Sequence, residues 1–413
     1  MNVLKLRFKD EDGRAFPEWQ QESLLNLSES GFTNGVFNDP TKVGSGYKLV
    51  NVLDMYIEST IDENRLSLVA LSESEFKRNK VEYGDLFFTR SSLVKEGIAY
   101  SNTYLGHSQD VTFDGHLIRM RPRTDLLNSV FTNYLLRTSS ARKQLVARGK
   151  TATMTTIGQA DIADVLITFP SLPEQTKIAA FLTAVDEKIS QLTQKHTLLT
   201  QYKKGVMQQI FSQELRFKDE DGREFPEWEE NTLGQIADIR RGASPRPIAD
   251  KKWFSANSKI GWVRISDVTK SNKYLNKTEQ YLSLTGIEKS RFVPKGHIIM
   301  SICATIGKPI YTNFDVCIHD GFVVFKDLKA NQWYFYYFLR LIEDKWYQYG
   351  QPGSQVNLNT DIVSGETINL PCFQEQTKIA NFLTALDDKI THTQAQLTAV
   401  KQYKQALLQQ MFV

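Results

Sequence analysis

Apolar residues recur every three or four positions between residues 172 and 213. This spacing places them on one stripe of an α-helix, in the a/d pattern of a coiled coil. The stripe consists of Leu182, Val185, Ile189, Leu192, His196 and Leu199, and Tyr202, Val206 and Ile210 continue it. Pro173 suits the first helical turn, where its missing N–H is not needed. The pattern predicts a helix of about forty residues, roughly 55–60 Å long at 1.5 Å per residue.

The same stripe returns near the end of the chain, between residues 372 and 413. Its positions are Leu383, Leu386, Ile390, Thr393, Leu397 and Val400, followed by Tyr403, Leu407 and Met411. A helix with such a stripe exposes apolar surface to water unless it has a partner, and the other copy is the nearest one. We therefore expect the two helices to form an antiparallel coiled coil. The alternative is that each helix packs on the core of its own domain.

The chain is an internal duplication. Residues 6–19 and 215–228 match at thirteen of fourteen positions, and residues 173–189 and 374–390 match at thirteen of seventeen. Such self-similarity indicates two tandem structural units. The first repeat places Asp-Gly between two apolar segments, which predicts a tight hairpin with a structural or docking role.

The segments between the repeats differ in sequence but keep one order of elements. Glycine turns enter buried strands near residues 84–88 and 296–300, and again near 114–118 and 320–324. An aromatic-rich helical stretch and a short strand ending at proline follow in both. The predicted divisions are a first α/β domain at 1–171 with hairpin 6–19, a helix at 172–213, a second domain at 214–371 with hairpin 215–228, and a helix at 372–413.

Composition restricts the function classes. The formal net charge is +3, so a nucleic-acid-binding role requires the basic residues to gather on one face. The chain has 3 cysteines and no CxxC pair, which favours a reducing cytoplasm. No apolar run approaches membrane-spanning length and the first residues do not form a signal peptide, so we expect a cytoplasmic protein without membrane contact.

Several segments resemble the specificity subunit of type I restriction–modification systems. They are the helix start Leu172–Ile178, the turn Arg240–Pro247, the stretch Gly261–Val268 that we expect to be a strand, and the Gly-Ser turn in 351–354. At the corresponding places the first domain has residues 44–48 and 149–151. The resemblance covers essentially the whole chain. It implies two α/β (α+β) target-recognition domains in a pseudo-two-fold arrangement, separated by two long helices that form an antiparallel coiled coil.

The resemblance also implies the function and the partners. Each recognition domain reads one part of a bipartite, asymmetric double-stranded DNA target, and the helices set the spacing. The helices also bind two methyltransferase subunits, and restriction/translocase subunits join the assembly. S-adenosylmethionine and ATP are then expected on the partner subunits and no cofactor on this chain.

Sequence motifs for catalysis are missing. No two of the 12 prolines are adjacent, so the (D/N)-P-P-(Y/F) loop of adenine methyltransferases is absent, as is a GxxxxGK[ST] phosphate loop. Three triplets fit (D/E)xK of nucleases, at 186–188, 343–345 and 387–389, but no Pro-Asp accompanies them. We interpret the first and third as solvated helix faces. The histidines and cysteines form no metal-ligand spacing. We therefore expect a non-catalytic subunit.

Basic and polar residues in the divergent domains are the candidate DNA contacts, because Arg and Lys bind phosphates and guanine, and Asn and Gln bind adenine. In the first domain they are Lys42, Ser45, Tyr47, Lys48, Arg90, Ser91, Ser92, Lys95, Arg148, Lys150 and Thr151. In the second they are Arg240, Arg241, Ser244, Arg246, Arg264, Gln351, Ser354, Gln355 and Asn357. Arg119, Arg121 and Arg123 alternate along a strand and are further phosphate candidates.

A coiled-coil adaptor that joins proteins without touching DNA is the alternative function. It accounts for the near-neutral charge and the long helices. It does not account for basic, glycine-flanked polar loops in both divergent domains.

Overall fold

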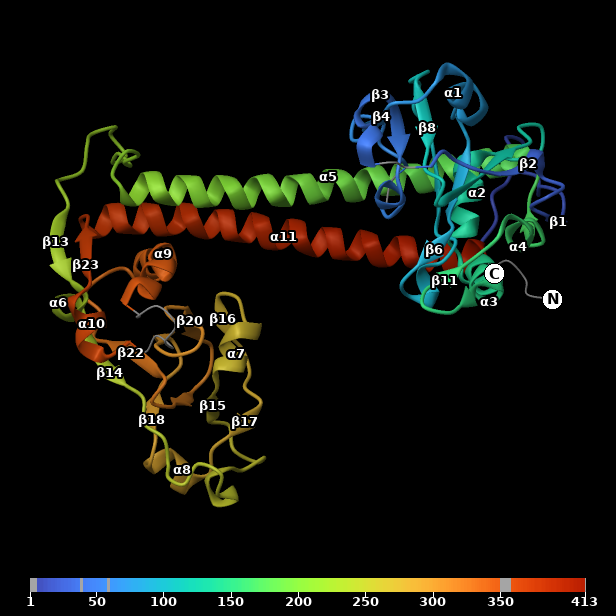
Figure 1. The fold of residues 1–413 in the computed structure, drawn as a ribbon. Helices are drawn as coiled ribbons and strands as arrows, with labels where there is room; N and C mark the ends of the chain where they lie inside the picture. Colours follow the sequence, from blue (N-terminus) through green and yellow to red (C-terminus); the bar gives the residue numbers. More distant parts are fainter. Residues whose placement is uncertain (1–5, 38–39, 58–59, 350–357, 413) are drawn as a thin grey trace. The chain divides into compact units, whose positions relative to one another are not determined.

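Residues 6–37, 40–57, 60–349 and 358–412 are described in the computed structural model of this chain. The chain divides into two units, residues 1–193 with 395–413, and residues 194–394. Each unit contains one α/β domain and parts of two long helices, α5 (Leu172–Phe211) and α11 (Phe373–Met411), of 40 and 39 residues (Figure 1). The two helices predicted from the repeats are confirmed.

Among its described residues, the first unit contains four sheets. The largest has four strands in the order β2 (Ser28–Asn34), β9 (Leu117–Pro122), β5 (Leu86–Thr89) and β7 (Ser101–Thr103). Two sheets have three strands each, one in the order β4 (Ser67–Val69), β3 (Val43–Val50) and β8 (Val111–Phe113), the other in the order β10 (Lys150–Thr151), β11 (Thr155–Thr156) and β6 (Ser91–Ser92). The fourth pairs β1 (Gln20–Ser23) with β12 (Leu166–Phe169). Its shorter helices are α1 (Glu73–Asn79), α2 (Ser129–Leu136), α3 (Ser139–Arg148) and α4 (Gln159–Ala163).

In the described part of the second unit, a similar plan contains three sheets. The first has five strands in the order β14 (Asp238–Arg241), β22 (Phe322–Lys326), β19 (Ile298–Ser301), β20 (Pro309–Thr312) and β16 (Tyr274–Leu275). The second has four strands in the order β17 (Gln280–Tyr281), β15 (Gly261–Val263), β21 (Val316–Ile318) and β18 (Arg291–Val293). The third pairs β13 (Glu229–Thr232) with β23 (Thr367–Leu370). The helices are α6 (Leu233–Ile236), α7 (Ile265–Lys270), α8 (Leu284–Glu288), α9 (Gln332–Leu341) and α10 (Thr360–Gly365). The predicted α/β class is confirmed.

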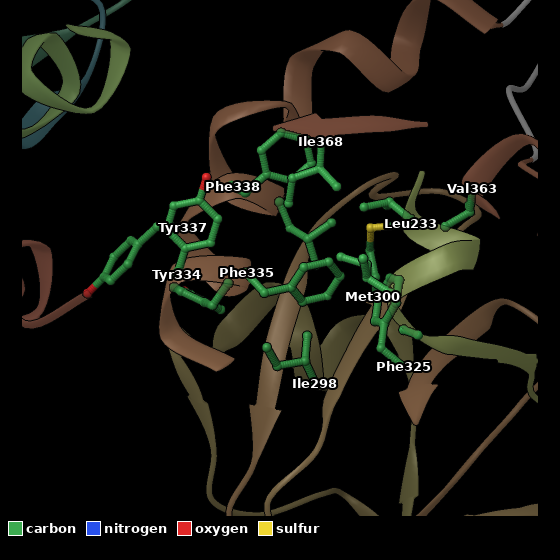
Figure 2. Packing of buried hydrophobic residues seen from close by; sticks show 14 of the residues in the cluster. Leu233, Ile298, Met300, Phe325, Tyr334, Phe335, Tyr337, Phe338, Val363 and Ile368 are labelled. Carbon is green, nitrogen blue, oxygen red and sulfur yellow. The ribbon is translucent and has the colours of Figure 1, made fainter. Parts of the chain in front are cut away.

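The core of the second domain forms between α9 and the five-stranded sheet. The ring of Phe335 meets the ring of Phe325 edge-on at 4.9 Å, and Figure 2 shows Phe335 directed toward the sheet near Met300. Phe335, Phe338 and Trp346 belong to this core, with exposed fractions of 0%, 7% and 0%. These aromatic rings hold the domain together and are not available to stack on bases.

The predicted packing of one long helix against the other is found over a short stretch. In the first unit Ile189 and Leu192 of α5 pack against Leu397 of α11, with Val185 and Val400 at the margin. Asp186 of α5 pairs with Lys404 of α11, whereas Ile189 and Leu192 pack with Leu397. The position on α11 falls as the position on α5 rises, so the helices are antiparallel there (Figure 1).

Outside this stretch, the stripe packs on the domains. Leu182 belongs to the core of the first domain, and Leu383 and Leu386 belong to that of the second. The two alternatives, helix pairing and packing on a domain core, therefore both occur, on different turns. Of the remaining predicted positions, His196, Leu199 and Ile390 are half-buried and Thr393 is buried.

The predicted continuation of the stripe is wrong at both tyrosines. Tyr202 and Tyr403 are 54% and 53% exposed. A straight helix drifts about 20° per heptad away from a 3.5-residue repeat. The neighbouring Lys203 and Lys404 consequently turn toward the partner helix, as their ion pairs described below show.

The repeated hairpins fold against the starts of the long helices. A bridge pairs Lys218 with Glu224, and the turn glycine Gly222 has φ +83°. Arg216 donates to both carboxylate oxygens of Glu375 in α11, at 3.3 and 2.9 Å, and Glu375 is fully buried. The first unit repeats this pair as Arg7 with Glu174. The hairpins are therefore confirmed, and each anchors a buried carboxylate.

The two hairpins differ in one hydrogen bond, which makes a prediction. The indole Nε1 of Trp228 donates to Glu375 at 3.0 Å, whereas the buried Nε1 of Trp19 has no partner among the described residues. We expect Trp228→Phe to lower the free energy of unfolding by about 1.5–3 kcal/mol, because a hydrogen bond to a buried charge is lost. Trp19→Phe is the matched control, with an expected change near zero. Equal losses in denaturant unfolding of the two variants would contradict this assignment.

One aspartate ties the first domain to both long helices. Asp186 of α5 accepts a hydrogen bond from the Tyr134 hydroxyl of α2 at 2.6 Å, and it pairs with Lys404 Nζ of α11 at 2.6 Å. Asp186 was expected on a solvated helix face, and this prediction is wrong because two elements cover it. Glu187 and Lys188 of the same triplet are exposed, as expected.

The second unit contains the equivalent aspartate with an additional cation. Asp387 of α11 accepts a hydrogen bond from the Tyr337 hydroxyl of α9 at 2.6 Å and pairs with Lys203 of α5. Lys273, just before β16, lies 3.8 Å from the same carboxylate. The expectation of a solvated face is therefore also wrong for Asp387. We call Asp186 and Asp387 the joint aspartates.

Candidate nucleic-acid interface

Four predicted DNA contacts of the second domain converge on one turn. Asp320 lies between β21 and β22, and its main-chain oxygen accepts from Arg241 Nε at 2.7 Å. Its carboxylate accepts from the Ser244 hydroxyl at 2.7 Å and from Arg246 Nη2 at 3.2 Å. A cavity of about 410 Å³ is lined by Ser244, Arg246, Trp262, Arg264, His319 and Asp320, among others. We call these lining residues, together with Arg241, the arginine pocket.

Glycine allows the chain to cross at the pocket. A Cβ at Gly242 would lie 1.9 Å from the carbonyl oxygen of His319. Since that contact is with backbone, no rearrangement of a side chain relieves it. Only glycine therefore lets the chain pass this close to the β21–β22 turn. Arg241 before Gly242 and Ser244 after it both reach Asp320 in that turn.

Arg264 lies between a strand and a helix, and not within a strand as predicted. The stretch 261–268 was predicted to be a strand, but only Gly261–Val263 is strand and α7 begins at Ile265. The Asp267 carboxylate accepts the main-chain N–H of Arg264 at 2.9 Å, which stops the strand and starts the helix. The exposed Arg264 side chain donates to Gln280 at 2.7 Å.

Protonation states in the pocket follow from burial and hydrogen bonds. The pKa of the Asp320 carboxyl is lowered, first because the Ser244 hydroxyl donates to it. Burial lowers the pKa of His319 below its ordinary value, so the ring is neutral at pH 7. The main-chain N–H of Gly321 donates to His319 Nδ1 at 2.9 Å, which leaves the proton on Nε2. The pocket thus offers cationic guanidinium groups, one carboxylate and one neutral N–H donor.

Other predicted contacts of the second domain lie apart from this pocket or outside the described residues. Arg240 alternates with Arg241 on β14 and pairs with Asp238 at 2.8 Å. Gln351, Ser354, Gln355 and Asn357 lie outside the described residues. Leu358, which follows them, lines a second cavity together with Arg241.

In the first domain, a small sheet brings two predicted groups together. β11 pairs with β6 through Thr156 and Ser91, and with β10 through Thr156 and Lys150. Arg90 precedes this sheet and Lys95 follows it, and both side chains are exposed. Ser92 and Thr151 both pair with Thr155. Lys150 on β10 is exposed as well, so this surface is basic.

The remaining predicted contacts of the first domain lie elsewhere. Arg148 donates to the main-chain oxygens of Gln144 and Asp164 at 3.3 and 3.1 Å. Tyr47 stacks on Phe76 with ring centroids 3.9 Å apart, and Lys48 donates to Ser108 at 2.7 Å. Lys42 and Ser45 are exposed.

Of the three further phosphate candidates on and next to β9, the prediction is wrong for two. Arg119 is 9% exposed and donates to the carbonyl of Lys80, and Arg121 binds both carboxylate oxygens of Asp85 at 2.9 and 3.1 Å. The side chains along β9 are buried or half-buried on both faces of the sheet. Arg123 remains exposed beside Asp125.

His319 and Asp320 line the arginine pocket but were not among the residues selected from the sequence. The visible signal was a His-Asp pair before a turn glycine, which gives no hint that β14 and α7 bring arginines to it. The described residues contain no group of three or more His, Cys, Asp or Glu arranged to hold a metal ion. Within the same ranges, no helix has the length and apolarity to cross a membrane.

Comparison with known families gives one consistent result. A sequence model described as the type I restriction modification DNA specificity domain matches residues 56–201 and again residues 226–402. The chain is 24% identical, over 417 residues, to the candidate specificity subunit of the type I restriction enzyme MjaX from Methanocaldococcus jannaschii. That match spans 97% of this chain and 94% of the relative.

Partial relatives and solved structures agree with this match. The EcoKI specificity subunit of Escherichia coli K12 is 26% identical over 210 residues, spanning 48% of this chain and 43% of that one. The fold is similar to that of the type I restriction–modification S subunit from M. genitalium, with a TM-score of 0.61 at 14% identity and coverage of 100% and 99% of the two chains. The HsdS subunit of Thermoanaerobacter tengcongensis gives a TM-score of 0.50 at 17% identity and coverage of 96% and 97%.

Proposed function

Because this chain belongs to the family of type I restriction–modification DNA specificity subunits, we propose that its two α/β domains each read one part of a split DNA target. The chain is the DNA-sequence specificity subunit of such a system. The observation that carries the proposal is the arginine pocket, in which three guanidinium groups from two chain segments lie around one turn of a divergent domain. Arginine held in a fixed orientation suits bidentate binding to guanine O6 and N7.

The chain acts within a larger assembly in this proposal. Two methyltransferase subunits dock on it and restriction/translocase subunits complete the complex in the cytoplasm. S-adenosylmethionine and ATP bind to those partners, and this chain contributes no catalytic residue. α5 and α11 set the spacer, so adding or removing whole heptads changes the unread spacer and leaves both half-sites unchanged.

The test is to map methylated adenines in DNA from cells that express this chain with its neighbouring methyltransferase subunit. We expect a split, asymmetric motif that disappears when this chain is deleted. No motif, despite an active methyltransferase subunit, would overturn the proposal in favour of a protein adaptor. Binding to DNA carrying the motif should also weaken steeply with salt, because phosphate contacts release counterions.

Substitution of Arg246 tests base reading by the arginine pocket. We expect Arg246→Ala to relax one guanine position of one half-site by about 1–3 kcal/mol, roughly 5–150-fold, and to leave the other half-site unchanged. Arg246→Lys is the conservative variant and should not restore full discrimination, because an ammonium group on a flexible stem lacks the fixed, planar pair of donors of a guanidinium group. Arg240→Ala, on the other face of β14, is the control. Uniform weakening over all positions would assign Arg246 to a phosphate instead.

A further inference from the structure

The turn between β8 and β9 of the first domain is the counterpart of the β21–β22 turn of the second domain. Strand register fixes this match. The last residue of β5, Thr89, pairs with Leu117 of β9, and the last residue of β19, Ser301, pairs with Phe322 of β22. The turn residues before Leu117 therefore correspond to those before Phe322, among them Asp320. The duplication thus shows what the first domain places where the second has the arginine pocket.

At this turn Asn34 of β2 stands in the place of Arg241. Asn34 pairs with Ile118 of β9, and Arg241 pairs with Val323 of β22, which is the equivalent position. A glycine follows directly in both domains. The first domain therefore has an amide side chain where the second domain has a guanidinium group.

The other two arginines of the arginine pocket also have no cationic counterpart among the described residues. Asn51 occupies the place of Arg264, because its main-chain N–H donates to the aspartate three residues later at 2.8 Å, as that of Arg264 does at 2.9 Å. The place of Arg246 falls on residues 38–39, which lie outside the described residues and have no basic side chain in the sequence. The first domain thus presents a different chemistry at this turn.

Asn34 holds a second amide, that of Gln159, in one orientation. Nδ2 of Asn34 donates to the main-chain oxygens of Gly115 and Leu117 at 3.4 and 3.2 Å. Its Oδ1 is thereby left to accept from Nε2 of Gln159 at 2.6 Å. Because Asn34 offers only an acceptor at this point, the amide of Gln159 cannot be turned over without losing the hydrogen bond.

The remaining polar groups of Gln159 are available to a ligand. Gln159 is the first residue of α4, and its side chain is exposed. Its second N–H and its Oε1 make no hydrogen bond with any described residue. A planar amide with one donor and one acceptor matches N7 and the N6 amino group of adenine, which lie side by side in the major groove.

Two exposed cations accompany this amide. The main-chain N–H of Arg90 donates to His116 in the turn at 2.8 Å, and the main-chain oxygen of Arg90 accepts from Ile157 at 3.0 Å. Lys150 lies 3.6 Å from the Asp161 carboxylate of α4. Cations beside a base-reading side chain suit phosphate contacts, which fix the position of the duplex while the amide reads a base.

The second domain lacks the equivalent of Gln159. α4 and α10 both begin directly after a capping residue, Gly158 in one and Asn359 in the other. The first residue of α10 is Thr360, which has no amide group. The change from Arg241 to Asn34 is therefore accompanied by the change from Thr360 to Gln159, and the two side chains of the first domain bind each other.

We propose that the first domain reads an adenine of its half-site with Gln159, at the turn where the second domain uses arginine. Gln159 is the specificity-determining residue, and Asn34 is a positioning residue that fixes its amide. This inference rests on the proposed function, because it assigns one base to a DNA-reading surface.

The experiment measures binding of the full-length chain, in complex with its neighbouring methyltransferase subunit, to duplexes that carry the mapped motif. Each adenine is replaced in turn by 7-deazaadenine, which lacks the N7 acceptor but still pairs with thymine. We expect one adenine of one half-site at which this replacement weakens binding by about tenfold. Gln159→Ala should weaken binding to the natural duplex to a similar extent and show no further loss with 7-deazaadenine at that position.

The matched control is Thr360→Ala, at the equivalent position of the second unit, which should leave the effect of 7-deazaadenine at this adenine unchanged. Asn34→Ala keeps Gln159 but releases its amide, so it should reduce the effect of 7-deazaadenine at the same adenine and at no other.

Three results would overturn the proposal. They are a wild-type complex that is insensitive to 7-deazaadenine throughout, a Gln159→Ala variant that keeps the full sensitivity, and a Gln159→Ala variant that loses affinity equally for unrelated DNA, which indicates a phosphate contact. Failure of the proposed function has a different signature, because the wild-type complex would then not prefer any motif over unrelated DNA.

Discussion

Arg216→Ala is expected to lower the free energy of unfolding of the second unit by about 3–5 kcal/mol, because it leaves a buried carboxylate without its cation. Glu375 is fully buried, and Arg216 is its guanidinium partner at 2.9 Å. The same arginine donates to the main-chain oxygens of Phe225 and Pro226 at 3.1 and 2.6 Å. Its loss therefore releases the hairpin as well as the charge. Denaturant unfolding followed by tryptophan fluorescence measures the change.

The control lies in the same hairpin. Arg223 pairs with Asp221 at 3.2 Å, but the two side chains are 75% and 66% exposed. An exposed pair contributes about 0–1 kcal/mol, so Arg223→Ala should have little effect. Adding Glu375→Gln to Arg216→Ala should recover part of the loss, since the uncompensated charge disappears while an acceptor for Trp228 remains. Equal effects of the two arginine variants would show that burial of Glu375 does not matter.

Local patterns predicted the elements of this fold well. The helices at 172–211 and 373–411 follow from apolar spacing along continuous sequence, and the repeats revealed the duplication. The strand Leu86–Thr89 follows a turn glycine, Gly84, at φ +89°. Each of these signals lies within a few residues of the element that it predicts.

Contacts between distant residues were not predictable in this way. Asp186 looked like a surface residue because its partner Tyr134 is 52 residues away in the sequence. Arg119 looked like a phosphate contact because alternation along a strand does not show that both faces of the strand are covered by other parts of the domain.

The candidate site was predicted only in part for the same reason. Arg241, Ser244 and Arg246 were selected as basic or polar residues of one turn, and Arg264 as part of a predicted strand. Three of these four residues converge on Asp320, with Ser244 and Arg246 on its carboxylate and Arg241 on its main-chain oxygen. Asp320 lies in a turn some eighty residues further along the chain than Arg241, so its role required the pairing of β14 with β22.

Asp387→Asn is expected to lower the free energy of unfolding by about 2–4 kcal/mol, because two half-buried or buried cations lose their carboxylate at once. Lys203 and Lys273 have side-chain exposures of 19% and 12%. The amide oxygen still accepts the hydrogen bond from Tyr337, so the variant removes the charge and little else. Calorimetric unfolding of the full-length chain measures the effect.

Asp186→Asn is the internal control for this prediction. Its carboxylate pairs with one lysine, Lys404, whose side chain is 20% exposed, and it accepts a hydrogen bond from Tyr134 in the same way. We expect a loss of about 1–2 kcal/mol, smaller than for Asp387→Asn because one cation is left unpaired instead of two. Lys273→Met in the Asp387→Asn background should recover part of the larger loss, since the buried ammonium group is removed while the stem is kept. A larger loss for Asp186→Asn than for Asp387→Asn would show that Lys273 is not stabilised by the joint aspartate.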